Sequence, residues 1–204
     1  MDKGKKPLAG PLEFPGPRPD EIDTEHLRDP ASYWVNATLR DGTPVHIRAI
    51  RADDHDEEAA FVQRMSPESR YFRFFEVKRD LTEAEIEYFT EIDFVNHVAL
   101  VVTRAQPSAP AFVGIGRYII GRDSPPDSAE IAFAVDDGLH GQGVGTLLLH
   151  HLSAIARANG LKEFRATVLS QNRAMLEVFA HSGLPRESTT ASEVTDVVLS
   201  LAGG

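Results

Sequence analysis

The residues with the greatest chemical potential lie in one stretch of the chain. A glutamate opens the run EIAFAV at 130–135, and a glycine-rich loop, DGLHGQGVGT, follows at 137–146. Glycines let a ligand approach the backbone closely, and the unpaired amides at the start of a helix attract an anion. A carboxylate next to such a loop is suited to accept a proton from a substrate. The stretch therefore predicts an anion-binding loop beside a general base.

Two common nucleotide-binding motifs do not fit this loop. The dinucleotide fingerprint G-x-G-x-x-G, started at Gly141, needs a glycine where Thr146 stands. The phosphate loop G-x-x-x-x-G-K-[ST] matches the spacing of Gly138 and Gly143, but Val144 occupies the lysine position. Thr146 and Val144 therefore exclude these two nucleotide-binding motifs, and the loop is expected to bind an anion of another kind.

The loop resembles the acyl-CoA loop of the GNAT superfamily of N-acetyltransferases, whose signature is [QR]-x-x-G-x-[GA]. The match covers 140–145, with a histidine in place of the usual Gln or Arg. The resemblance implies acetyl-CoA as cosubstrate, with backbone amides holding its pyrophosphate. The loop residues that it implies for cofactor binding are His140, Gly141, Gln142, Gly143, Val144, Gly145 and Thr146.

Further features downstream are similar to the same superfamily. Asn172 and Gly183 match two of its positions, and the Asn is implied to contact the pantetheine side of the cofactor. Phe179 stands where many members have a tyrosine that protonates the departing thiolate, and a phenyl ring has no proton to give. The backbone of 133–135 is implied to pair with the pantetheine amides, which adds Phe133, Ala134 and Val135 to the binding residues.

Two runs look like the acetyltransferase domain of bacterial protein lysine acetyltransferases of the Pat type. They are RYFRFF at 70–75 and AEIAFAV at 129–135. The resemblance implies a protein lysine as acceptor and Glu130 as general base. Removing the proton from a lysine of pKa about 10.4 at pH 7 costs about 4.6 kcal/mol, so a base is needed. The chain has no cysteine, in agreement with direct attack of the amine on the thioester.

The residues themselves also favour Glu130. In a strand it shares one face with Ala132 and Ala134, whose small side chains leave room for an acyl group and an amine. We expect partial burial of this carboxylate, which would make it a better base. Three alternatives remain: a solvated strand-end glutamate, acetylation of a small-molecule amine, and a non-catalytic acyl-CoA-binding sensor.

The elements that must position these residues alternate between strand and helix. Asp41-Gly42 predicts a hairpin turn, and Thr82 with Glu85 matches a capping box. Strands are predicted at 35–39, 45–50, 98–103, 112–120, 130–135, 164–169 and 194–201, with helices at 53–65, from 66, at 82–92, 143–159 and 172–182, and a loop at 106–110. The order predicts a mixed α/β domain. The resemblance implies a GNAT-like, mostly antiparallel central sheet flanked by helices and splayed at the acyl-CoA site.

Composition and charge set the remaining limits. Residues 1–33 hold six of the 13 prolines and few apolar residues, so we expect an extended or disordered tail before an N-acetyltransferase domain at 34–204.

Lys plus Arg number 21 against 31 for Asp plus Glu, a net charge of −10. This acidity argues against nucleic-acid and membrane partners. We expect no metal, because the adjacent His150 and His151 diverge by about 100° on a helix. The start of the chain has no secretory pattern, so the cytoplasm is the expected location.

Overall fold

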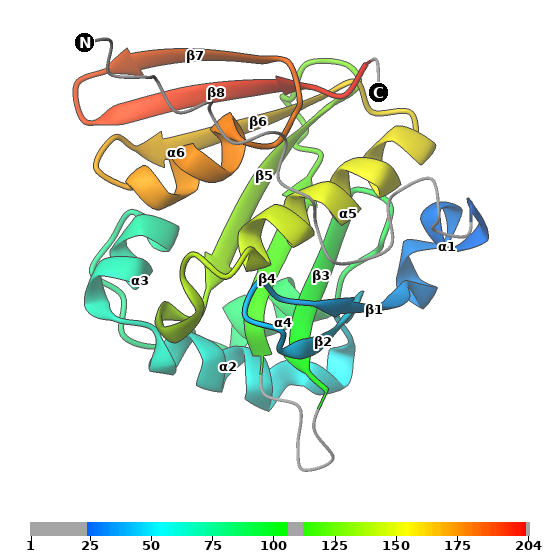
Figure 1. Cartoon of the computed structure of the whole chain (residues 1–204), viewed down its shortest axis with the longest axis vertical. Coiled ribbons are helices and arrows are strands. Elements are labelled where there is room, and N and C mark those ends of the chain that lie inside the picture. Colours follow the sequence, from blue (N-terminus) through cyan, green and yellow to red (C-terminus); the bar gives the residue numbers. More distant parts are fainter. Residues whose placement is uncertain (1–23, 106–111, 203–204) are drawn as a thin grey trace, which may run out of the picture.

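The computed structural model describes residues 24–105 and 112–202, which form one eight-stranded sheet in the order β1-β2-β3-β4-β5-β6-β8-β7 (Figure 1). Neighbouring strands are antiparallel except β5 and β6, which are parallel. The strands are β1 Trp34–Thr38, β2 Pro44–Ala49, β3 His97–Arg104, β4 Phe112–Ile119, β5 Ser128–Val135, β6 Glu163–Leu169, β7 Arg186–Ala191 and β8 Val194–Ser200. The expected mixed, mostly antiparallel sheet is confirmed.

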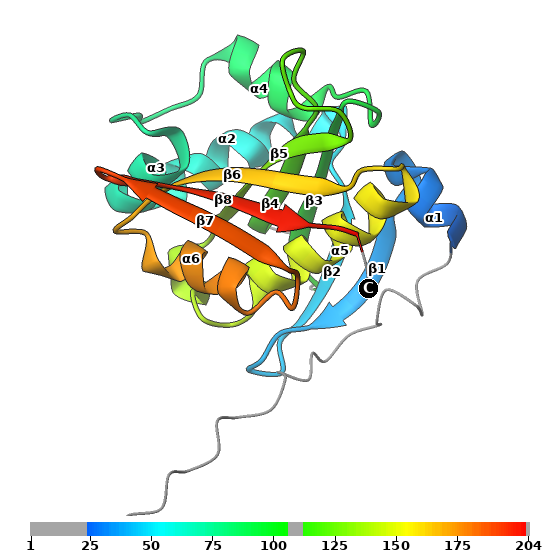
Figure 2. The same ribbon diagram turned by 90° about the horizontal axis from the view of Figure 1, so that it is seen from above.

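Helices cover both faces of the sheet (Figure 2). They are α1 Thr24–Arg28, α2 His55–Arg64, α3 Pro67–Phe74, α4 Glu83–Thr90, α5 Val144–Ala158 and α6 Arg173–Ala180. Alternation along β3 shows the two faces, because Leu100 belongs to the core beneath α5 whereas Val101 belongs to the core beneath α2. Within 24–105 and 112–202, no helix has the length and apolar character needed to cross a membrane.

Most predicted elements form close to their predicted bounds. Gly42, at φ +87°, supplies the left-handed turn between β1 and β2, and the Asp41 carboxylate accepts the Thr43 N–H at 2.9 Å. Thr82 and Glu85 form the predicted capping box, with the Thr82 N–H 2.8 Å from the Glu85 carboxylate. The helix that it starts ends at Thr90, two residues before the predicted end. The predicted loop at 106–110 lies outside the described residues.

The segment before β1 is more structured than its proline content suggests. Residues 24–28 form α1, and a turn of 3-10 helix covers Pro30–Ser32. Leu27, Pro30 and Tyr33 are buried, and the Asn159 side chain at the end of α5 donates to the Leu27 carbonyl at 3.1 Å. Because a few apolar residues pack on α5, this part of the expected tail joins the domain. Residues 1–23 lie outside the described part of the chain.

Strand β7 was not predicted from the sequence. All six of its residues are exposed and most are polar, so the hydrophobic alternation that marks a strand is absent. It forms because each of its residues pairs with β8, from Arg186 opposite Leu199 to Ala191 opposite Val194. The pairing supplies backbone hydrogen bonds, which cannot be predicted from the pattern of side chains.

The parallel strands β5 and β6 diverge, and this divergence opens the sheet. Their register covers only Ser128–Glu163, Ala129–Phe164 and Glu130–Arg165. On its other side β5 remains paired with β4 as far as Val135, which lies opposite Gly114. From Ile131 to Val135, the edge of β5 that faces β6 therefore has no strand partner among the described residues.

Two polar groups in the core are held by specific partners. Glu58 in α2 and Arg117 in β4 form an ion pair of 2.9 Å, and each side chain is only 3% exposed. Arg117 also lies over the Phe89 ring, 4.3 Å from its centre. On the other face, the Tyr33 hydroxyl is 2.5 Å from Nδ1 of the buried His151.

The buried ion pair generates a stability prediction. Replacing Arg117 with methionine leaves the Glu58 carboxylate buried without its cation, so we expect the free energy of unfolding to fall by about 3 kcal/mol in urea titrations. Lys162 pairs with Asp127 at 2.6 Å on the surface, and Lys162→Met serves as the matched control with a midpoint close to that of the wild type. Equal midpoints for the two variants would contradict the prediction.

The buried histidines generate a pH prediction. Burial lowers the pKa of His151 to about 3, aided by His150, and lowers the pKa of His97 to about 4, aided by Arg117. An unfolded histidine has a pKa of about 6.5, so below that pH the unfolded chain binds protons that the folded chain does not. The free energy of unfolding should therefore decrease as the pH is lowered. Each histidine contributes a loss of about 1 kcal/mol per pH unit between pH 6 and its pKa in the folded chain.

Urea titrations at pH 7, 6 and 5 measure this dependence. His151→Gln, which keeps a polar side chain beside Tyr33, should show a shallower loss than the wild type, whereas His181→Gln, at an exposed position, should not. A slope unchanged by His151→Gln would refute the assignment.

Candidate acyl-CoA and acceptor site

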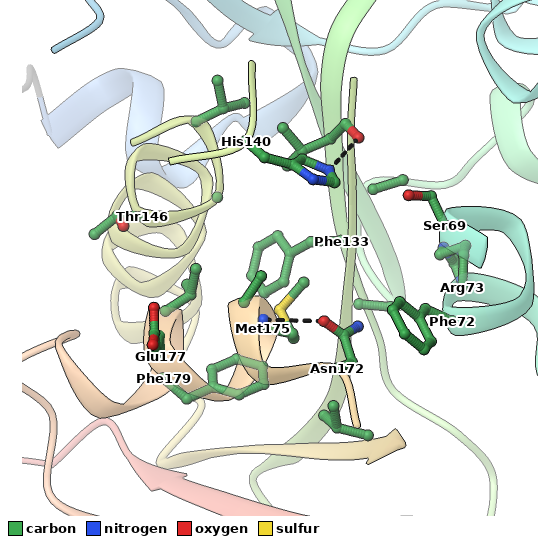
Figure 3. Close-up of a pocket in the computed structure, with 18 of the residues that line it drawn as sticks. Ser69, Phe72, Arg73, Phe133, His140, Thr146, Asn172, Met175, Glu177 and Phe179 are labelled. Carbon is green, nitrogen blue, oxygen red and sulfur yellow. Dashed lines mark hydrogen bonds between the residues drawn. The ribbon is translucent and has the colours of Figure 1, made fainter. Parts of the chain in front are cut away.

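A cavity of about 410 Å³ lies where β5 and β6 separate. Its walls come from β5, the glycine-rich loop with the start of α5, the first turns of α6, and α3 (Figure 3). Of the twelve residues predicted for the site, eleven line this cavity, namely Glu130, Phe133, Ala134, Val135, His140, Gly141, Gly143, Val144, Gly145, Thr146 and Asn172. Gln142 does not line it, so one element of the prediction differs.

The β5 wall alternates as predicted. Ile131 and Phe133 are buried in the core, while Glu130, Ala132 and Ala134 share the opposite face and line the cavity. The carboxylate of Glu130 is exposed, so the expected partial burial is not found in the structure. The reason is local, because the pairing of β5 with β6 ends at Glu130.

The glycine-rich loop forms an uncapped helix start. A short 3-10 turn follows β5, with the Asp136 carboxylate accepting the Gly138 N–H at 2.9 Å. Gly141 and Gly143 have φ of +78° and +91°, a region that favours glycine. Gly143 is the N-cap of α5, and no side chain within 24–105 and 112–202 accepts the amides of the first turn. Those amides and the positive end of the helix dipole are therefore available to an anion.

Two side chains secure this loop. His140 Nε2 lies 3.2 Å from the Val135 carbonyl, so this nitrogen carries the donated proton. Arg40, which precedes the hairpin turn, donates from Nη1 to the Gly141 carbonyl at 3.0 Å. Its backbone N–H donates to the Gln142 carbonyl at 3.1 Å. Arg40 was not predicted from the sequence, because a contact across about a hundred residues leaves no local pattern.

The α6 wall starts at Asn172. Its Oδ1 accepts the Met175 N–H at 3.1 Å and caps α6, which leaves Nδ2 without an acceptor in the described ranges (Figure 3). Phe179 is buried, with its ring centre 6.1 Å from that of Phe133. Its position in the core explains why a phenyl ring is accommodated there, and it offers no proton.

The α3 wall faces β5 across the cavity and carries Ser69, Phe72 and Arg73 (Figure 3). Arg73 stacks over Phe74 and Phe89, 5.3 and 5.9 Å from the ring centres. Burial and the neighbouring Arg117 lower the pKa of Arg73 to about 10, while the charges of Glu58 and Glu130 act in the opposite direction. Arg73 therefore remains a cation on the wall opposite the Glu130 carboxylate.

One carboxylate ties α3 to the glycine-rich loop. Asp137 accepts the Ser66 N–H at 2.7 Å, the Ser66 hydroxyl at 2.9 Å and the Ser69 hydroxyl at 2.5 Å. Burial alone would raise the pKa of Asp137, but the hydrogen bonds from Ser69 and Ser66 outweigh it and lower the pKa. Ser66 also caps α3, so this contact sets where the α3 wall begins.

In the part of the chain that the structure describes, no three His, Asp or Glu side chains are grouped to hold a metal ion. The cavity combines a carboxylate, an open strand edge and an uncapped helix start, which together suit an acyl donor bearing phosphates.

Comparison with known proteins agrees with this geometry. The model of the acetyltransferase (GNAT) family matches residues 68–184. Acetyltransferase PA5475 of Pseudomonas aeruginosa is 31% identical over 146 residues, which are 72% of this chain and 77% of that protein. Acetyltransferase Pat of Mycolicibacterium smegmatis is 28% identical over 149 residues, 73% of this chain but only 44% of the relative.

Solved structures show the same architecture. The GNAT domain of S. lividans PAT superposes with a TM-score of 0.74 at 34% identity, covering 82% of this chain and 96% of that domain. A cAMP-binding acyltransferase from Mycobacterium smegmatis, at 23% identity and a TM-score of 0.59, shares the fold over 88% of this chain and 52% of its own length. The chain is an acetyltransferase and belongs to the GNAT family.

Proposed function

We propose that this chain transfers the acetyl group of acetyl-CoA to the side-chain amine of a protein lysine, with Glu130 as general base. The observation that carries the proposal is the single cavity in which Glu130, the open edge of β5 and the uncapped start of α5 meet. The edge suits the amides of pantetheine, the helix start suits the pyrophosphate, and the carboxylate lies at the far end of the same strand.

Direct transfer fits the residues that line the cavity. The neutral amine attacks the thioester carbonyl, the carbon–sulfur bond breaks, and the proton of the amine passes to the Glu130 carboxylate. Neutralising a lysine of pKa about 10.4 at pH 7 costs about 4.6 kcal/mol, which is the task assigned to Glu130. Because Phe179 has no ionisable proton, protonation of the departing thiolate falls to water, with the dipole of α5 stabilising the negative charge.

The α3 wall supports a lysine side chain as acceptor. Phe72 and Phe75 line the cavity, and Phe75 is 43% exposed beside Tyr71 at 36%. Such apolar surface suits the methylene stem of a lysine, and the net charge of −10 favours a basic partner. The relatives named Pat support the same class of acceptor, although this chain matches less than half of the curated one.

The proposed base is tested by Glu130→Gln. With lysine-bearing proteins as acceptors, we expect kcat at pH 7 to fall by about 100-fold, a typical loss for a general base. Activity should recover as the pH rises, because free amine then forms without the carboxylate. Release of CoA thiol from acetyl-CoA measures the rate.

The matched control for the base is Glu177→Gln, which removes a second exposed carboxylate from the cavity lining. It should keep its rate, and both variants should bind CoA as the wild type does. Full activity of Glu130→Gln at pH 7 would show that another group takes the proton. Turnover restricted to small amines in an acceptor panel would favour a small-molecule acetyltransferase.

The proposed phosphate cradle is tested by Gly143→Glu. This change puts a carboxylate at the start of α5, where the phosphates are expected, so CoA should no longer raise the thermal midpoint of the variant. Gly160→Glu is the control, because Gly160 has a similar φ of +86° at the other end of α5 with nothing within 4 Å of an added Cβ. Equal protection of both variants by CoA would place the phosphates elsewhere.

A further inference from the structure

The guanidinium of Arg40 lies on the loop that is expected to hold the phosphates. Its Nη1 donates to the Gly141 carbonyl at 3.0 Å. Its Nε, Cγ and Cδ atoms lie 3.5 to 3.8 Å from the position of an added Cβ on Gly143. The side chain thus runs alongside the N-cap of α5, and it lines the cavity.

Most of the hydrogen-bonding capacity of Arg40 is unused. A guanidinium has five N–H donors in a fork, and only the Gly141 carbonyl accepts one of them among residues 24–105 and 112–202. No carboxylate in those ranges forms an ion pair with Arg40. The remaining donors can point at a phosphate while the bond to Gly141 holds the group in place.

The position of His140 leaves room for such a cation. The resemblance places a Gln or Arg at this first position of the loop signature, but the His140 ring is bonded to the Val135 carbonyl on β5. A polar side chain is thereby lost from the phosphate end of the loop. Arg40 brings one back from the β1–β2 hairpin, whose own turn is bonded to the loop through the Gln142 carbonyl.

We propose that Arg40 binds the pyrophosphate of CoA together with the amides at the start of α5. This inference rests on the proposed function, since it concerns the same cofactor site. A planar fork matches two phosphate oxygens at once, and a fixed cation offsets the repulsion that a chain of net charge −10 exerts on an anion. Arg40 then has two roles. It orders the loop through its hydrogen bond to Gly141, and it offsets the negative charge of the phosphates.

The test measures binding alone, by calorimetry with wild type, Arg40→Gln and Arg40→Lys. Both variants keep the backbone bond from position 40 to the Gln142 carbonyl, and glutamine has no charge. Binding of pantetheine then separates the ligand contact from the order of the loop. For Arg40→Gln we expect Kd to rise about tenfold for CoA and equally for dephospho-CoA, which lacks the 3′-phosphate. Arg40→Lys, which keeps the charge, should lose less. Added salt should weaken wild-type binding more than that of Arg40→Gln.

Two controls accompany these measurements. Pantetheine, which has no phosphate, should bind equally well to the wild type and to Arg40→Gln. Arg104→Gln removes a cation from β3 that is outside the cavity lining, and its Kd for CoA should match the wild type.

The outcomes separate the possible errors. An unchanged Kd for CoA in Arg40→Gln overturns the inference and leaves the proposed function standing. A loss seen with CoA but not with dephospho-CoA assigns Arg40 to the 3′-phosphate and overturns the pyrophosphate contact. An equal loss with pantetheine means a distorted loop and also overturns it. Failure of the wild type to bind CoA at all would refute the proposed function itself.

Discussion

The separation of β5 from β6 is the constraint on which the rest of the structure depends. A parallel pair normally continues its ladder along both strands, but here the register ends after Glu130–Arg165. The backbone of β5 beyond that point is left with polar groups on an open edge, which water or a ligand must satisfy. The helices α5 and α6 begin at the sides of this opening and α3 closes it from the other face, so the cavity is a direct consequence of the interrupted ladder.

Three contacts fasten the glycine-rich loop, two of them to segments distant in sequence. Arg40 reaches it from the first hairpin, Asp137 binds the N-cap of α3, and the His140 ring returns to the end of β5. Each contact joins a loop atom to an element with its own place in the core. The loop therefore keeps an open, ligand-ready shape although its glycines alone would leave it many conformations.

An element of the fold can be predicted from the sequence when neighbouring residues form a recognisable local pattern. The hairpin at Asp41-Gly42, the capping box at Thr82 and the alternation along β5 depend on neighbouring residues, and all three form as predicted. Strand β7 pairs with β8 directly after it but has no hydrophobic alternation, and it was missed. Helix α1 packs on α5, which lies far along the chain, and it was assigned to a tail. The site divides in the same way: motif spacing located the loop and Glu130, whereas the exposure of Glu130 and the approach of Arg40 follow from tertiary packing.

The strand order also places β7 at an outer edge of the sheet, with a different consequence. An unpaired edge can template the addition of a strand from another molecule, which leads to aggregation. All six residues of β7 are exposed, and it begins with the charged pair Arg186 and Glu187, so its surface offers little to an apolar strand. The edge of β5, by contrast, lines the cavity inside the sheet and not its outer border. The polar β7 edge thus resists self-association, while the interior edge of β5 stays open to a ligand.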